Sequence, residues 1–190
     1  VDLGNLVAVD TETLGLSLTR DPLCVVQLSA GDGDAHVVQM DRRRYDCPNL
    51  KALMGSPDVE KIFHFARFDV AVMKKYLEID TAPVYCTKIV SKLVRTYTDR
   101  HGLKDLCREL GGVSLDKQQQ SSDWGADEIS DAQKNYAASD VLYLHKVKAK
   151  LDMMLAREGR THLAEAAFRF LPTRCEMDLV GYGDMDIFSH

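Results

Sequence analysis

The sequence predicts an α/β fold in which helices flank a mixed sheet of five strands. Three observations indicate this class. Short apolar runs alternate with turns in the first half of the chain, helical segments then begin to follow the strands, and the second half is mostly helical. A length of 190 residues, with 45% hydrophobic and 28% charged residues, favours a single domain with a sizeable core.

Five short apolar runs are expected to form the sheet. They cover residues 6–10, 23–29, 35–40, 61–64 and a short strand around 84–85. The glycine- and aspartate-rich turn at 31–34 separates the second and third runs. Because the early strands follow one another directly and the later ones alternate with helices, we expect both antiparallel and parallel pairing.

Apolar residues recur at helical spacing mainly in the second half of the chain. The expected helices are 49–54, 68–76, 88–97, 103–110, 131–157 and 161–171. We expect Pro172 to end the last helix, because proline lacks the backbone N–H that a helix interior requires. This places the main domain at residues 1–171 and an irregular tail at 172–190.

Composition narrows the class of protein. No apolar run reaches the ~18 residues that a membrane span needs, and no signal-peptide pattern is found. Five cysteines without a Cys-x-x-Cys pair favour reduced thiols in a cytoplasmic protein and argue against structural zinc. The net charge of −5 argues against a long basic track for nucleic acid, so any such substrate is expected to be short or held locally.

Two carboxylates lie at the end of the first apolar run. Asp10 and Glu12 are two residues apart, so in an extended chain their side chains point to the same face. Like charges converging on one point repel unless a cation holds them, which is the layout of a hard-metal site. The same spacing recurs at Asp58 and Glu60, but there it follows a turn rather than a strand.

Three further residues extend this pattern. Asp69 lies at the start of the helix after the fourth strand, where helix capping is the simpler interpretation. Tyr136 and Asp140 are four residues apart on the long helix and share one face. The alanines between them would let this face approach another element closely.

Taken together, Asp10-x-Glu12, Asp69 and Tyr136-x-x-x-Asp140 resemble the three motifs of the DEDD exonucleases in their tyrosine-containing subclass. Blocks such as 11–16, 64–66, 103–106, 115–117, 122–124 and 136–144 are similar to those of ribonuclease D. The resemblance implies an RNase H-like fold. It departs from ribonuclease D in having Asp127-Glu128 where Arg-Pro is common, and in lacking the helical RNA-binding domains. In this respect the chain resembles the nano-RNase C family, whose members degrade very short RNAs and form rings.

The residues suit a chemistry based on two cations. Carboxylates without a histidine or cysteine cluster select Mg²⁺ or Mn²⁺ over zinc. Two such ions can activate a water and stabilise the leaving 3′ oxygen of a phosphodiester. Asp10 would bridge the ions, with Glu12 and Asp140 on the nucleophile side and Asp69 on the second ion. Tyr136 would orient the water, since its ordinary pKa near 10 makes it a poor base.

Contacts to substrate are less specific. Candidate substrate-binding residues are Thr11, Leu16, His64 and Phe65. By resemblance Leu16 would wedge between two terminal bases, and a core leucine is the alternative. His64 would touch a phosphate and Phe65 would stack on a base, with a capping histidine and a core phenylalanine as alternatives. Arg95 belongs to a basic group that could receive a 5′ phosphate or form a solvated face, and the polar segment 118–124 could line the site.

The sequence therefore predicts a 3′–5′ exoribonuclease that degrades short oligoribonucleotides, including dinucleotides, to nucleoside 5′-monophosphates. Two alternatives stay open: a 3′–5′ exonuclease on longer single-stranded RNA or DNA, and a catalytically silent nucleic-acid-binding module. The apolar tail after Pro172 must pack somewhere, on its own domain or on a neighbouring chain. We expect the second, giving a closed homo-oligomer, a ring whose active sites adjacent subunits restrict.

Overall fold

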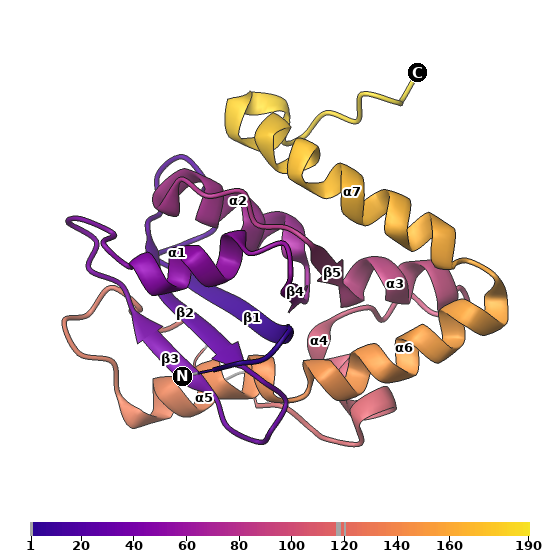
Figure 1. Cartoon of the computed structure of the whole chain (residues 1–190), viewed down its shortest axis with the longest axis horizontal. Coiled ribbons are helices and arrows are strands. Elements are labelled where there is room, and N and C mark those ends of the chain that lie inside the picture. Colours follow the sequence, from indigo (N-terminus) through magenta and orange to yellow (C-terminus); the bar gives the residue numbers. More distant parts are fainter. Residues whose placement is uncertain (1, 117–118, 120) are drawn as a thin grey trace.

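The sheet is mixed and has five strands, as predicted. The computed structural model describes residues 2–116, 119 and 121–190. Its strand order is β3-β2-β1-β4-β5, with β1 antiparallel to β2 and parallel to β4 (Figure 1). The strands are β1 (Leu6–Thr13), β2 (Leu23–Ser29), β3 (His36–Gln39), β4 (Glu60–Phe63) and β5 (Val84–Cys86).

Helices cover both faces of the sheet. The helical elements are α1 (Pro48–Gly55), α2 (Ala66–Leu77), α3 (Thr87–Val94), α4 (Leu103–Leu106), α5 (Asp131–Leu142), α6 (Leu144–Glu158) and α7 (Thr161–Met177), with π-helical turns η1 (Cys107–Gly111) and η2 (Asp178–Tyr182). Helices α1 and α2 pack on one face, whereas α5 and α6 pack on the other (Figure 1). Helix α7 runs along α2 and contributes to the core on the same face of the sheet as α1 and α2.

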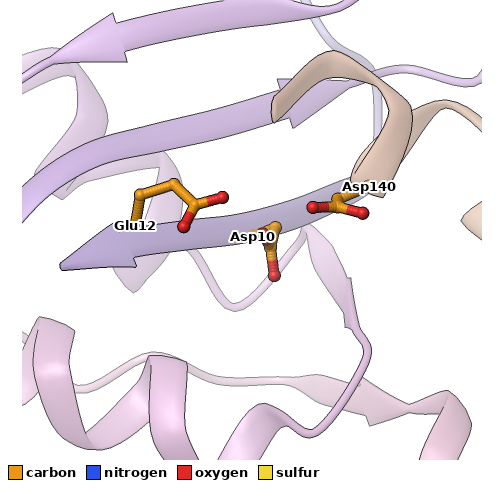
Figure 2. A group of neighbouring side chains, drawn as sticks. All are labelled: Asp10, Glu12 and Asp140. Atoms are coloured by element: carbon orange, nitrogen blue, oxygen red, sulfur yellow. The ribbon is translucent and has the colours of Figure 1, made fainter. Parts of the chain in front are cut away.

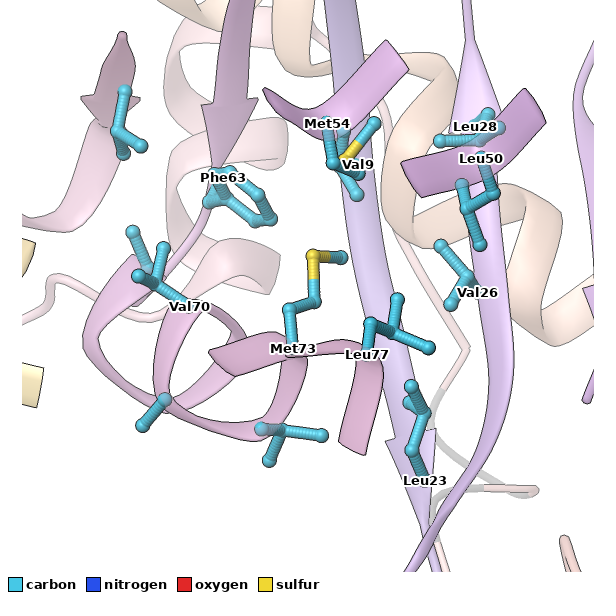
Figure 3. Close-up of a cluster of buried hydrophobic side chains, with 14 of the residues drawn as sticks. Val9, Leu23, Val26, Leu28, Leu50, Met54, Phe63, Val70, Met73 and Leu77 are labelled. Carbon is cyan, nitrogen blue, oxygen red and sulfur yellow. The ribbon is translucent and has the colours of Figure 1, made fainter. Parts of the chain in front are cut away.

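The core follows the alternation of β1. Val9 points toward α1 and α2 and belongs to the same buried cluster as Met54, Phe63 and Met73 (Figure 3). Ala8 points the other way, into the cluster formed with α5 and α6. Because side chains alternate along a strand, Asp10 and Glu12 follow Ala8 onto the α5 side.

Strand β1 is longer than predicted. It continues past Asp10 to Thr13, and its pairing with β2 stays regular until the register shifts between Glu12 and Thr13. The expectation that the strand ends at Asp10 is wrong, because the polar side chains after Asp10 leave backbone pairing with β2 intact. Both acidic residues therefore lie on the strand itself.

Two helix predictions are also wrong. The segment 131–157 forms two helices, since Tyr143 has φ −107° and ψ −3° and separates α5 from α6. Helix α7 does not end at Pro172 but continues to Met177. A proline inside a helix costs about 3 kcal/mol; here the packing of Leu171 and Cys175 in the core offsets that cost.

The sequence predicts that the chain has no membrane-spanning segment and that its cysteines are reduced. None of the helices in the described ranges combines the length and the apolar composition that a membrane crossing requires. All five cysteines are free thiols. The division of the chain at residue 171 stays a prediction, and in the structure this position lies inside α7.

Candidate active site

Three carboxylates from two elements meet at one point. Asp10 and Glu12 come from β1 and Asp140 from α5, and each offers an oxygen such that these atoms all lie within 4.8 Å of one another. Figure 2 shows the two strand carboxylates on one face of β1, with Asp140 approaching from the neighbouring helix. The structure thus brings together three of the four predicted metal ligands.

Helix α5 is held in place at its N-terminus. Ser130 accepts a hydrogen bond from the backbone N–H of Gln133, whose side chain in turn accepts from the N–H of Ser130. This capping box satisfies two amides that would otherwise lack partners. Ala137 is completely buried against the residues of β2, and its small side chain allows the close approach that Asp140 needs.

Asp69 reaches the site from the opposite layer. It is the fourth residue of α2 and lies in the first turn of that helix, whose N-cap residue is Phe65. The hydroxyl of Thr11 donates a 2.6 Å hydrogen bond to Asp69 Oδ1. Asp69 lies outside the three-carboxylate group but lines the same cleft. This geometry commits the Thr11 hydroxyl to Asp69, and a contact between Thr11 and substrate stays a prediction.

The acids disfavour one another's charge. Burial raises the pKa of Asp10 well above its ordinary value, and the charges of Asp69, Asp140 and Glu12 raise it further. Burial and the charges of Asp140 and Asp69 raise the pKa of Glu12 to about 8. Burial raises the pKa of Asp69 to about 7, although hydrogen bonding from Thr11 opposes the change. Such a cluster gains most from a cation, which would stabilise all the ionised forms at once.

The donor set fits hard divalent metal ions. Every candidate ligand is a carboxylate, and oxygen-only sites suit Mg²⁺, Mn²⁺ and Ca²⁺ rather than zinc. Within the described residues, this is the single group of three or more potential ligands close enough to share an ion.

Tyr136 stands beside the acids on the same face of α5 as Asp140, as its spacing predicts. Its ring packs against that of Trp124, with centroids 6.0 Å apart. Burial raises the pKa of Tyr136 above its ordinary value, and the charges of Asp140, Glu12 and Asp10 add to this effect. The phenol therefore keeps its proton and can act as a hydrogen-bond donor or a positioning group.

The mouth of the cleft is lined by exposed apolar side chains and by a lysine side chain. The cleft has a volume of about 690 Å³, in the range of small-ligand sites. Leu16 is 86% exposed at its edge and Phe65 is 45% exposed. The alternatives that these are core residues are therefore wrong. Lys88 lies over the Phe65 ring, 4.4 Å from its centroid, and also lines the cleft.

His64 lines the cleft between strand β4 and helix α2. Its Nδ1 lies 2.9 Å from Thr87 Oγ1, and that hydroxyl donates to the carbonyl of Phe63. Phe65, not His64, is the N-cap residue of α2, with a left-handed φ of 66°. The alternative of a capping histidine is thus wrong, and a contact with phosphate stays a prediction.

Other sequence expectations have mixed outcomes. Ser121, Ser122 and Trp124 from the polar segment line the cleft, whereas Lys117, Gln118 and Gln120 lie outside the described residues. Arg95 is completely buried, where it bonds to Glu109 and donates to the carbonyl of Arg100 at 2.7 Å. It is therefore neither a phosphate contact nor part of a solvated face.

One residue of the site escaped the sequence reasoning. Gln27 lies on β2 directly opposite Asp10, and its Nε2 lies 3.3 Å from both Asp10 Oδ2 and Glu12 Oε1. The available signal was a single amide side chain in the middle of an apolar run. Such a residue is typical of a strand whose buried face meets a polar site.

Comparison with known proteins identifies the family. The sequence profile of a family described as 3′–5′ exonuclease matches residues 2–156. The chain belongs to this 3′–5′ exonuclease family, and it is similar to ribonuclease D. It is 36% identical over 154 residues to ribonuclease D of Acidiphilium cryptum, an alignment that covers 81% of this chain and 39% of that protein. The chain therefore spans about two fifths of the length of this relative.

Solved structures give a second, longer match. Brucella melitensis NrnC with bound Mg²⁺ superposes with a TM-score of 0.94 at 56% identity, covering 98% of this chain and 90% of that chain. The same protein bound to pGG gives 0.95 at 57% identity, with the same coverage. These matches confirm the predicted RNase H-like exonuclease fold and the resemblance to ribonuclease D and nano-RNase C.

Proposed function

We propose that this chain is a metal-dependent 3′–5′ exoribonuclease that degrades short oligoribonucleotides, including dinucleotides, to nucleoside 5′-monophosphates. The observation that carries the proposal is the group formed by Asp10, Glu12 and Asp140, with Tyr136 beside it in one cleft. The catalytically silent alternative is disfavoured because all five motif residues are present and line this cleft.

Each residue then has a defined role. Asp10, Glu12 and Asp140 would hold one divalent ion, Mg²⁺ or Mn²⁺, and Asp69 with Asp10 a second. When bound, such ions supply charge to the phosphodiester and lower the pKa of water. Tyr136 keeps its proton and orients the attacking water by hydrogen bonding. Lys88 and Lys104, which also line the cleft, can neutralise phosphate charge.

The preference for short RNA rests on the mouth of the cleft and on net charge. Leu16 and Phe65 offer apolar surfaces on which two bases can stack. With a net charge of −5, the chain is poorly suited to holding a long phosphate backbone. The structure of the related NrnC, which is bound to the short ligand pGG, supports this proposal. The free thiols suit action in the cytoplasm.

We also propose that the active form is a closed homo-oligomer, most simply a ring. The residues after α7 expose a group of large apolar side chains to solvent, namely Val180, Tyr182, Met185, Ile187 and Phe188. Exposed apolar surface of this kind is typical of an interface. A neighbouring chain seated there could narrow the cleft and restrict it to short substrates.

Time courses on 5′-labelled RNA and DNA strands, from dinucleotides to long single strands, test the proposal with Mg²⁺ and with Mn²⁺. We expect the dinucleotide to be hydrolysed fastest, and Asp10→Asn to abolish hydrolysis. Asp58→Asn is the matched control, because Asp58 has the same Asp-x-Glu spacing but is exposed and does not line the cleft. Faster hydrolysis of long strands would favour the alternative of a general single-strand exonuclease. Activity retained in Asp10→Asn would remove the proposed metal site.

A further inference from the structure

Gln27 lies at the centre of β2 and is completely buried. Its neighbours Val25, Val26 and Leu28 are apolar and also buried, as expected for a strand covered by helices on both faces. An amide in such a place destabilises the fold unless its polar atoms find partners. What the amide of Gln27 contacts is therefore informative about its role.

The amide nitrogen is directed at the predicted metal ligands. In the antiparallel ladder Gln27 is opposite Asp10, so the two side chains share one face of the sheet. Nε2 lies 3.3 Å from Asp10 Oδ2 and 3.3 Å from Glu12 Oε1, and so spans the two acids. These are the two strand carboxylates that Figure 2 shows on the same face of β1.

The amide oxygen of Gln27, unlike the nitrogen, makes no such contact. Gln27 Oε1 is buried and has no hydrogen-bond partner among the described residues. A methionine or leucine would fill a similar volume without leaving an oxygen unpaired. Stability of the fold alone therefore does not account for glutamine at this position, whereas its contact with both acids does.

We propose that Gln27 is a positioning residue, which orients the carboxylates of Asp10 and Glu12 for binding divalent cations. This inference rests on the metal-dependent activity proposed above. The amide engages one oxygen of each acid, Asp10 Oδ2 and Glu12 Oε1, from the strand that pairs with β1. Hydrogen bonds of this kind behind metal ligands fix the ligands' orientation before the metal binds.

Isothermal titration of the metal-free protein with Mn²⁺ and with Mg²⁺ tests the role directly. We expect Gln27→Met to bind metal about ten- to a hundred-fold more weakly than the wild type. Its thermal unfolding without metal should stay cooperative. In activity assays the variant should need more metal, and its kcat should approach the wild-type value at saturating metal. Ser29→Ala is the matched control, because Ser29 is buried on the same strand but its hydroxyl donates to the carbonyl of Asp34.

The outcomes separate this inference from the proposed function. Wild-type metal affinity in a folded Gln27→Met would overturn the positioning role while leaving the nuclease proposal intact. If Gln27→Met does not fold, Gln27→Asn decides, since it keeps a buried amide but withdraws it from the acids, and weaker metal binding is again expected. Failure of both variants to fold would make the amide structural and overturn the inference. Absence of metal binding by the wild type, or its persistence in Asp10→Asn, would instead refute the proposed function.

Discussion

Replacing Glu12 with glutamine should stabilise the metal-free protein at alkaline pH. The pKa of this carboxyl rises from an ordinary 4.5 to about 8 because it is buried near Asp140 and Asp69. Between these pH values the folded state keeps a proton that the unfolded state has released. The free energy of unfolding therefore falls as pH rises from about 4.5 to about 8, and stays low above that pH.

The size of the effect follows from the pKa change. At about 1.4 kcal/mol for each pH unit, the rise from 4.5 to about 8 corresponds to roughly 5 kcal/mol. The protonation of Glu12 is coupled to that of the neighbouring acids. The loss of stability is therefore shared among these acids, and part of it remains in Glu12→Gln. We expect Glu12→Gln to gain about 1–3 kcal/mol at pH 8.5 and little at pH 5. For a chain of this length, each kcal/mol raises the melting temperature by about 2–4 °C.

Calorimetric unfolding in chelator across this pH range measures the difference. The control is Glu165→Gln, which changes the same residue type at an exposed position on α7. Added Mg²⁺ should stabilise the wild type and the control but not Glu12→Gln, because only the ionised ligand set binds the cation. Parallel pH profiles for Glu12→Gln and the wild type without metal would refute the reasoning about repulsion between buried acids.

Three further predictions concern other parts of the chain. Tyr136→Phe should lower kcat about 100-fold or more with KM unchanged in steady-state assays, and full activity would exclude Tyr136 from catalysis. Burial lowers the pKa of Lys61 from 10.5 to about 8. Between these pH values the unfolded state binds a proton that the folded state has released, so the free energy of unfolding rises with pH from about 8 to about 10.5. Lys61→Met should abolish that rise in denaturant titrations, and a persisting rise would contradict the assignment to Lys61. Val180→Asp combined with Phe188→Asp should lower the mass measured by light scattering, and an unchanged mass would exclude this surface as the interface.

Patterns within one element predicted the sheet and most of the site. Alternation along a strand was enough to place Asp10 and Glu12 on one face, and helical spacing was enough to pair Tyr136 with Asp140. Neither inference depends on a partner element. The strands and helices were found for the same reason, although β1 and α7 extend further than predicted.

What the sequence did not show depends on contacts between distant segments. Helix α7 continues through Pro172 because its later turns pack on α2. Arg67 of α2 also forms a 2.6 Å ion pair with Asp178, the residue that follows α7. Arg95 is buried because Glu109 and the carbonyl of Arg100 surround it. Gln27 belongs to the site only because β2 pairs with β1 in one register. No local pattern encodes these partners.

The end of β1 joins the two layers of the molecule at the site. Asp10 and Glu12 face α5, which supplies Asp140, whereas Thr11 between them binds Asp69 of α2 on the opposite side. Three consecutive residues thus lie beside acids from helices on both faces of the sheet. A register slip of one residue would exchange these faces and separate the acids. Tight pairing of β1 with β2, where Gln27 meets Asp10, is therefore as important to the site as the carboxylates themselves.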